Sequence, residues 1–357
     1  MIIDVSLYEK IHYCFFCLGV LCLPLNVYGH RAIRKATPKR MQSYRYCLSG
    51  YQICCLSFDL FAATSITPIA CFPAKCAFSL GLASFLGISL TFQGVIACFW
   101  ISLMLSFLGL AILQRQQSIL PDDHWLSFSA YPKFQYFIGF LFLFVHPITP
   151  ASIFAYFLVT SDVPRGVREA LQDYPALVNC ILQPTAFCMD SSWKPFNIYP
   201  PPLFYFSFIL FVSGLLMVPT YMSLYQQRKI MSAKTLKLQK KWLYNLNVQF
   251  GVFSMVFVVP VTWFGLVFFL SIDDIAGLNI IPTIMASLHG TINTIVLFTL
   301  YESYQKFAID ELREVLREIR RLFFLLFFKS RKTEDIRNNR QHSLHTSVVS
   351  VLSDRHC

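Results

Sequence analysis

The sequence of 357 residues has few charges, and seven long stretches have almost none. Charged residues make up 14% of the chain, compared with about 25% in soluble domains. Each stretch is long enough to cross a bilayer, because a membrane helix needs about 20 apolar residues. A soluble domain is excluded, and the pattern predicts an all-α membrane protein with seven transmembrane helices. The stretches are residues 11–30, 46–74, 76–114, 134–161, 195–227, 242–272 and 275–301, and Asp59 is the single charge within them.

Catalytic and cofactor-binding patterns are also missing from the sequence. There is no His/Glu or Cys/His cluster with metal-ligand spacing, and no glycine-rich loop of the kind that holds phosphate. The paired acids Asp122-Asp123 and Asp273-Asp274 lie in short connections that we expect on opposite sides of the membrane. We therefore expect neither an enzyme nor a cofactor.

The distribution of basic residues predicts how the chain is oriented. Of the 30 Lys and Arg residues, 25 follow the first, third, fifth and seventh stretches, and 5 lie on the other side. The positive-inside rule then places the amino terminus outside and the tail in the cytoplasm of a multi-pass plasma-membrane protein. We attribute the net charge of +11 to this orientation and to anionic inner-leaflet lipid, and not to nucleic-acid binding.

The sequence predicts four segments. They are an extracellular amino terminus (1–10), the transmembrane domain (11–301), an amphipathic cytoplasmic helix (302–329) and a disordered tail (330–357). In the third segment apolar residues recur at helical spacing beside acid–Arg pairs, which is typical of a helix lying at the membrane interface. The spans are expected at 11–30, 46–72, 80–113, 134–160, 203–225, 246–270 and 279–300.

Polar residues and prolines inside the spans are candidates for function. An ionisable residue at membrane depth is costly, so Asp59 is interpreted either as a conformational or cation-linked switch or as a carboxyl that holds helices together. Asn293 is its expected partner at similar depth in the last span. Pro260 is expected to kink the sixth span and forms a third switch candidate.

A small-molecule pocket needs polar and aromatic groups around a mostly apolar cavity. Gln93 and Trp263 are expected in the outer half of their spans, and His289 shares a helix face with Asn293. We predict that these three residues, Gln93, Trp263 and His289, contact the ligand; helix bridging and packing are the alternative roles.

Two further groups lie at the expected membrane faces. Arg115, Lys240 and Lys241 are candidate contacts for a cytoplasmic partner, and lipid phosphate is the alternative contact. Near the outer face, where disulfides persist, Cys76 is expected to bond with either Cys180 or Cys188, the alternative being unpaired thiols.

Together these features resemble a G-protein-coupled receptor, and more closely the nematode serpentine chemoreceptors of class i and the related class h. The matching stretches are residues 37–41 and 44–53 with Asp59 and Leu60, residues 238–241 and 248–250 through to Pro260, and His289 with residues 293–296. The resemblance implies a receptor, in the ciliary membrane of sensory neurons, that binds a small environmental molecule among its helices and activates a heterotrimeric G protein.

The sequence departs from the receptor pattern in two places. Gln114 precedes Arg115 where receptors in general carry Asp-Arg-Tyr, and the last span ends Leu300-Tyr301-Glu302 in place of a Pro-Tyr-Arg-like ending. The departure at Gln114 favours a non-signalling receptor homologue as one alternative. A transporter or ligand-gated channel subunit is the other, although it predicts more polar faces within the spans.

Overall fold

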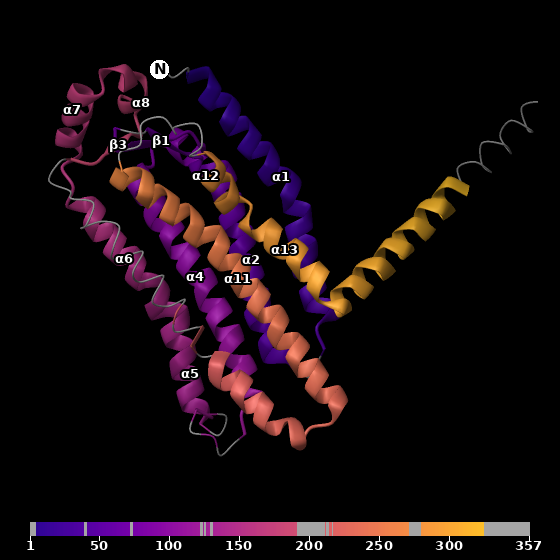
Figure 1. Cartoon of the computed structure of the whole chain (residues 1–357). Coiled ribbons are helices and arrows are strands. Elements are labelled where there is room, and N and C mark those ends of the chain that lie inside the picture. Colours follow the sequence, from indigo (N-terminus) through magenta and orange to yellow (C-terminus); the bar gives the residue numbers. More distant parts are fainter. Residues whose placement is uncertain are drawn as a thin grey trace, which may run out of the picture. The chain divides into compact units, whose positions relative to one another are not determined.

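The structure is a computed structural model in which the chain forms an elongated helical bundle over residues 1–304 (Figure 1). About half of the predicted fifth span (203–225) lies outside the described residues, as does the whole of the predicted tail. The described residues are 5–38, 41–71, 74–121, 124, 126–128, 131–190, 211, 214–215, 217–270 and 280–324.

Most of the predicted spans correspond to long helices. Over the part of the chain that the structure describes, five helices are apolar and long enough to cross a membrane, and α12 with α13, which are bent by 58° relative to each other, count as a sixth if the pair is one span. The all-α membrane architecture is therefore confirmed. The helices are α1 (Val5–Ala36), α2 (Gln42–Leu60) with the π-helical turn η2 (Phe61–Ile66), α4 (Leu90–Gln117), α5 (Pro132–Phe140) joined by η3 (Leu141–Val145) to α6 (His146–Val159), α11 (Ala233–Leu270), α12 (Ile280–Ser287) and α13 (His289–Leu300).

Between the second and third spans the structure differs from the prediction. Residues 67–89, expected to be mainly helix ends, form a hairpin and the short helix α3 (Leu82–Phe85). The second span ends at Ile66 because Thr67 adopts a left-handed φ of 35° and precedes Pro68, which disfavours helical geometry at the residue before it. Strand β1 (Pro68–Cys71) pairs antiparallel with β2 (Cys76–Ser79), and β2 pairs antiparallel with β3 (Phe187–Cys188).

A second group of short helices packs on this sheet. It contains α7 (Val163–Asp173), the 3-10 turn η4 (Pro175–Leu177) and α8 (Val178–Ile181), which share a buried cluster with the strands. We call residues 67–89 with 163–190 the hairpin cap. Of the two partners that the sequence left open for Cys76, the structure joins it to Cys188 by a disulfide. Cys180 is a buried thiol in the same cluster.

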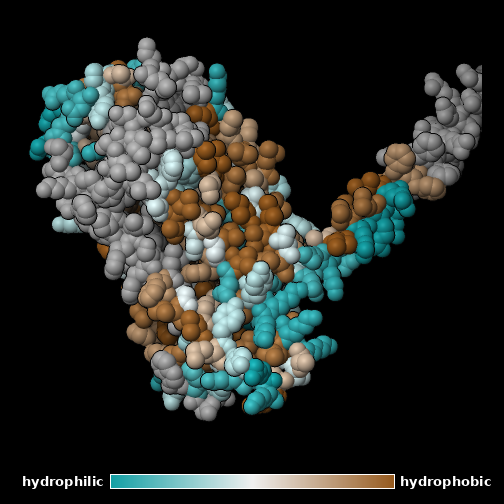
Figure 2. Space-filling model, in the orientation of Figure 1, coloured by the Kyte–Doolittle hydropathy of each residue, from teal (hydrophilic) through white to brown (hydrophobic). Residues whose placement is uncertain are grey.

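The main core lies between α2, α4, α11 and α13, where Leu48, Leu105, Leu108, Phe253 and Leu297 are buried together. Large apolar side chains also cover the outside of the bundle, and Figure 2 shows them along its flank. Exposed apolar area on this scale is suited to contact with lipid chains, because soluble monomers rarely carry it.

Residues 302–324 form one helix after α13. From residue 305 onward the helix belongs to a separate compact unit. Its apolar side chains, among them Leu312, Leu316 and Ile319, are exposed. The charged side chains form intrahelical pairs, Asp310 with Arg313 at 3.4 Å and Glu318 with Arg321 at 2.8 Å. In Figure 2 the helix has a hydrophobic and a hydrophilic side, which agrees with the predicted amphipathic character.

The packing of α7 on β3 leads to a prediction at Gly166. A Cβ atom there would overlap the backbone carbonyl of Cys188, whereas a Cβ at Gly139 in α5 meets nothing within 4 Å. We expect Gly166→Ala to destabilise the purified protein by roughly 1–3 kcal/mol, because a backbone cannot yield as a side chain does. Gly139→Ala is the matched control and should be neutral or slightly stabilising. Thermal unfolding in detergent measures both, and equal stability of the two variants would contradict the packing.

Candidate functional site

The carboxylate of Asp59 lies at the break in the last span. It accepts hydrogen bonds from the backbone N–H groups of Gly290 (3.0 Å) and Thr291 (3.1 Å), and from Asn26 Nδ2 (3.2 Å). These N–H groups belong to the first turn of α13, which has no acceptor within the helix. The N-cap residue Leu288 has no polar side chain, so Asp59 supplies from α2 the acceptor that a capping side chain would provide. Its negative charge also faces the positive end of the helix dipole.

Gly290 makes this approach possible. A Cβ at position 290 would lie 2.6 Å from Asp59 Oδ2 and 3.0 Å from the Cβ of Cys55, both closer than atoms normally pack. The break after α12, the glycine and the carboxylate therefore depend on one another.

A network of buried amides and hydroxyls extends from Asp59. Gln52 Nε2 donates to Thr294 Oγ1 (2.6 Å), Thr294 Oγ1 is 2.8 Å from Asn26 Oδ1, and Asn26 Nδ2 is 3.2 Å from Thr291 Oγ1. All of these side chains are at most 9% exposed. The sequence analysis did not single out Asn26, Gln52, Thr291 or Thr294, although each is a polar residue within an apolar stretch. We call the network, together with Asp59 and Asn293, the polar network.

The expected pairing of Asp59 with Asn293 is wrong. Asn293 Nδ2 donates to Gln52 Oε1 at 3.1 Å, while Asp59 bonds to Asn26 and to the first turn of α13. Because α2 and α13 run in opposite directions, a residue farther along α13 lies level with an earlier residue of α2. The backbone N–H groups that the helix break leaves without acceptors donate their hydrogen bonds to the carboxylate instead.

His289, next to Gly290, is enclosed by aromatic rings. It is fully buried, and its Nε2 lies 2.9 Å from the hydroxyl of Tyr51. The rings of Phe253 and Phe257 lie 5.4 Å and 4.8 Å from its ring centre. His289 therefore connects α2, α11 and α13 beside the Asp59 contact.

The other predicted ligand residues lie in different surroundings. Gln93 is fully buried at the start of α4, where it accepts from Ser79 Oγ (2.9 Å) and donates to the carbonyl of Ile88 (2.7 Å). It thus ties the hairpin cap to α4. Trp263 is half-buried in α11, three residues after Pro260, and the helix continues past that proline to Leu270.

Two hollows bounded by described residues lie in the bundle, and one is small and the other open. One beside Gly19, Ala63 and Leu288 has a volume of about 10 Å³, room for a single water at most. An open apolar groove of about 280 Å³ runs between α4 and α6, past Phe99 and Ala151. None of Gln93, Trp263 and His289 lines either of them.

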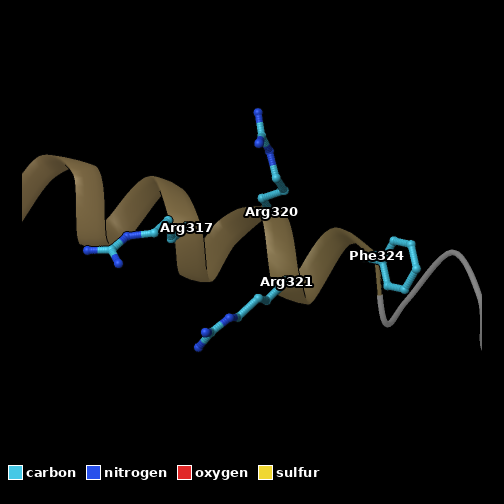
Figure 3. A pocket seen from close by; sticks show the side chains of 4 residues that line it. All are labelled: Arg317, Arg320, Arg321 and Phe324. Atoms are coloured by element: carbon cyan, nitrogen blue, oxygen red, sulfur yellow. The ribbon is translucent and has the colours of Figure 1, made fainter.

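A further hollow lies along the helix of residues 305–324. It is lined by Arg317, Arg320, Arg321 and Phe324. Figure 3 shows that these side chains point in different directions from a single helix and enclose nothing. It is an open, basic surface and not a binding pocket.

Arg115 marks the opposite end of the bundle, which we call the basic end. Its Nη2 donates to Gln239 Oε1 at 2.5 Å, and its guanidinium lies 5.7 Å from the ring centre of Trp242. The neutral Gln239 of α11 is thus the partner of Arg115, whose neighbour Gln114 is also uncharged. Lys240 is exposed and Lys241 pairs with Glu302 at 2.5 Å.

Aromatic residues tie the basic end together. The Trp242 ring packs on Tyr301 at 4.9 Å and on Tyr44 at 6.0 Å, and the two tyrosine hydroxyls are 3.0 Å apart. Tyr304 is hydrogen-bonded to Thr37 at 2.8 Å. Contacts therefore reach from α1 and α2 to the end of α13, beside Arg115.

Residues 8–314 match a protein family described as serpentine type 7TM GPCR chemoreceptor Srh. The matched range contains the polar network, the hairpin cap and the basic end, and it stops within the helix of residues 302–324. Of the two classes that the sequence resembles, the match is to class h. No curated protein matches the sequence.

The geometry predicts the effects of changes at Asp59 and Gly290 on stability. Asp59→Ala leaves two backbone N–H groups and an amide without their buried acceptor, so we expect a loss of roughly 2–5 kcal/mol. Gly290→Ala should also destabilise, because its methyl group displaces the carboxylate. Gly251→Ala in α11, where a Cβ meets nothing within 4 Å, is the matched control. Thermal unfolding of the detergent-solubilised protein compares them; a Gly290→Ala protein as stable as the control would be evidence against the contact.

Proposed function

Because the chain belongs to the Srh family of serpentine seven-transmembrane chemoreceptors, we propose that it detects a small environmental molecule within its helix bundle and activates a heterotrimeric G protein. The observation that carries this proposal is the contact between Asp59 and the broken last span. It joins three helices through one buried carboxylate, at a point where the backbone of the span is interrupted.

This contact is suited to switching because its energy lies within the reach of a ligand. A hydrogen bond to a charged group contributes about 1.5–3 kcal/mol. A ligand of micromolar affinity supplies about 8 kcal/mol of binding free energy. If the ligand binds better when α12 is shifted, part of that energy moves Gly290 and Thr291 relative to Asp59, as a change of state requires.

The ligand contacts that we propose are Gln93, Trp263 and His289. His289 is adjacent to Gly290, so a ligand that alters its aromatic surroundings acts one residue from the Asp59 contact. Gln93 joins the hairpin cap to α4, and Trp263 lies near the cap-side end of α11 beside Pro260. We propose that the conformational switch involves three residues, Asp59, Asn293 and Pro260. Of these, Asp59 and Asn293 belong to the polar network.

We propose that the hairpin cap and amino terminus face outward and that the basic end faces the cytoplasm. A disulfide at the cap supports this, since disulfides persist in oxidising compartments. The basic residues of the connections at the other end support a cytoplasmic position for that end. In this orientation Arg115, Lys240 and Lys241 are the proposed G-protein face, and the helix of residues 302–324 lies on the inner leaflet of the plasma membrane, including that of a sensory cilium.

Ligand-evoked G-protein activation tests the function. We expect cells expressing the wild-type chain to respond to at least one compound of a broad odorant panel. Asp59→Asn should change the potency or basal activity by about tenfold, the equivalent of 1.4 kcal/mol at the contact, while surface expression stays near normal. The exposed Asp173→Asn in α7 is the matched control and should behave as wild type.

Failure across the panel, with surface expression confirmed, would count against the proposal. Ligand binding without G-protein activation would identify a non-signalling homologue, and ligand-evoked ion flux would identify a channel or transporter. Loss of surface expression alone in Asp59→Asn would mean that the carboxylate only holds the helices together.

The orientation has a test of its own. Epitope tags at the two termini should be detected by antibodies from outside the cell at the amino terminus, and only after permeabilisation at the carboxyl terminus. An inverted result would exclude the receptor proposal, because the basic end could not meet a cytoplasmic G protein.

A further inference from the structure

Three cysteines lie side by side across the sheet of the hairpin cap. Cys71 of β1 is opposite Cys76 of β2, which is opposite Cys188 of β3. Residues directly opposite one another in antiparallel strands direct their side chains to the same face. The disulfide uses Cys76 and Cys188 and leaves Cys71 beside it on that face.

A fourth cysteine reaches the same place from α8. Cys180 and Cys71 are only 2% and 1% exposed, and both belong to the buried cluster of the cap. The hydrogen bond between their thiols, followed by burial, raises the pKa of Cys71 above its ordinary value. The two thiols thus lie close enough to interact, within the one buried cluster of the cap.

The existing disulfide brings the second pair together. It joins the end of the 71–76 turn to the end of the 180–188 segment, so a bond from Cys71 to Cys180 would close only these two short segments into a ring. A short closure of this kind makes the local concentration of one thiol near the other high. The surrounding side chains Ile69, Phe78, Leu177 and Ile181 are apolar, and a disulfide suits them better than two S–H groups do.

We propose that Cys71 and Cys180 are oxidised to a second disulfide, so that the hairpin cap carries two adjacent bridges. The oxidant is a disulfide of a dithiol–disulfide oxidoreductase in the oxidising compartment that supports the first bridge. The Cys71 thiolate attacks that disulfide and forms a mixed disulfide. Cys180 then attacks the Cys71 sulfur, and the oxidoreductase leaves as a dithiol that has gained two electrons and two protons.

The bond forms while the cap folds. A buried thiol with a raised pKa holds little thiolate, which is the attacking species, so the folded pair is protected from later exchange. Once formed, the second bridge fixes α8 to the strand that directly follows the second span. The cap is then joined to α2, and so to the helix that carries Asp59, without depending on apolar packing alone.

Peptide mapping of the full-length protein from cell membranes tests the pairing. Free thiols are blocked with N-ethylmaleimide in denaturant before digestion without reduction. Trypsin cuts after Lys75 and separates Cys71 from Cys76, while chymotrypsin cuts after Leu182 or Phe187 and separates Cys180 from Cys188. We expect a linked peptide pair containing Cys71 and Cys180 beside the pair containing Cys76 and Cys188.

Variants make the result specific. In Cys71→Ser the Cys180 peptide should become labelled by N-ethylmaleimide, and in Cys180→Ser the Cys71 peptide should, while Cys98→Ser in α4 changes neither. Recovery of both peptides fully labelled from wild-type protein that retains the Cys76–Cys188 link would overturn the proposal. So would a link from Cys71 to any other cysteine. The mapping needs no ligand or G protein, so its outcome is independent of the proposed function.

Discussion

An interrupted helix inside a bilayer must find acceptors for the backbone N–H groups that the interruption frees, because no water is present to take them. In this chain Asp59 meets that requirement for the first turn of α13. Other features follow from it. Position 290 must lack a side chain, and the carboxylate, itself costly to bury, needs the additional donor Asn26. Gln52 and Thr294 then donate hydrogen bonds to the Oδ1 atom of Asn26.

The helix α13 connects the Asp59 contact with the basic end of the bundle. At its first turn α13 carries His289 and the Asp59 contact, and directly after its last residue Tyr301 packs on Trp242, whose ring lies beside Arg115. A helix of 12 residues is stiff on the scale of a small displacement. In the proposed function, movement at the break would be passed on to the aromatic cluster at the basic end, which gives the proposed ligand contact His289 a physical connection to the proposed partner contact Arg115. The contacts at its two ends are discrete hydrogen bonds and an edge-on aromatic contact between Trp242 and Tyr301, which favour distinct arrangements over gradual deformation.

The membrane class and most of the spans followed from the spacing of charges, because charged residues are excluded from helices that cross the bilayer. The receptor family followed from short motifs. What failed had local causes. Residues 67–89 are as apolar as the spans around them, and composition does not separate a short buried strand from the end of a helix. The prediction of Cys180 or Cys188 as the partner of Cys76 was correct, and the choice of Cys188 follows from strand register, which two cysteines eight residues apart do not reveal. Asn293 was paired with Asp59 because the two were expected at similar depth in the membrane. The helix breaks at Leu288, where no proline or glycine marks the break in the sequence, and the backbone N–H groups after the break bond to the carboxylate instead.

The partner of Arg115 bears on how the basic end is held. Among the described residues, the partners of the guanidinium are the uncharged Gln239 and the ring of Trp242, and its neighbour Gln114 is uncharged as well. A charge-assisted hydrogen bond contributes about 1.5–3 kcal/mol, and a partly buried cation–π contact up to about 2 kcal/mol. These values are similar to those of the hydrogen bonds at Asp59. An individual hydrogen bond at Asp59 and an individual contact of Arg115 are therefore of similar strength. The departure from the acid-bearing pattern at Gln114 thus leaves Arg115 tied to α11 by a hydrogen bond to an amide and by a contact with an aromatic ring.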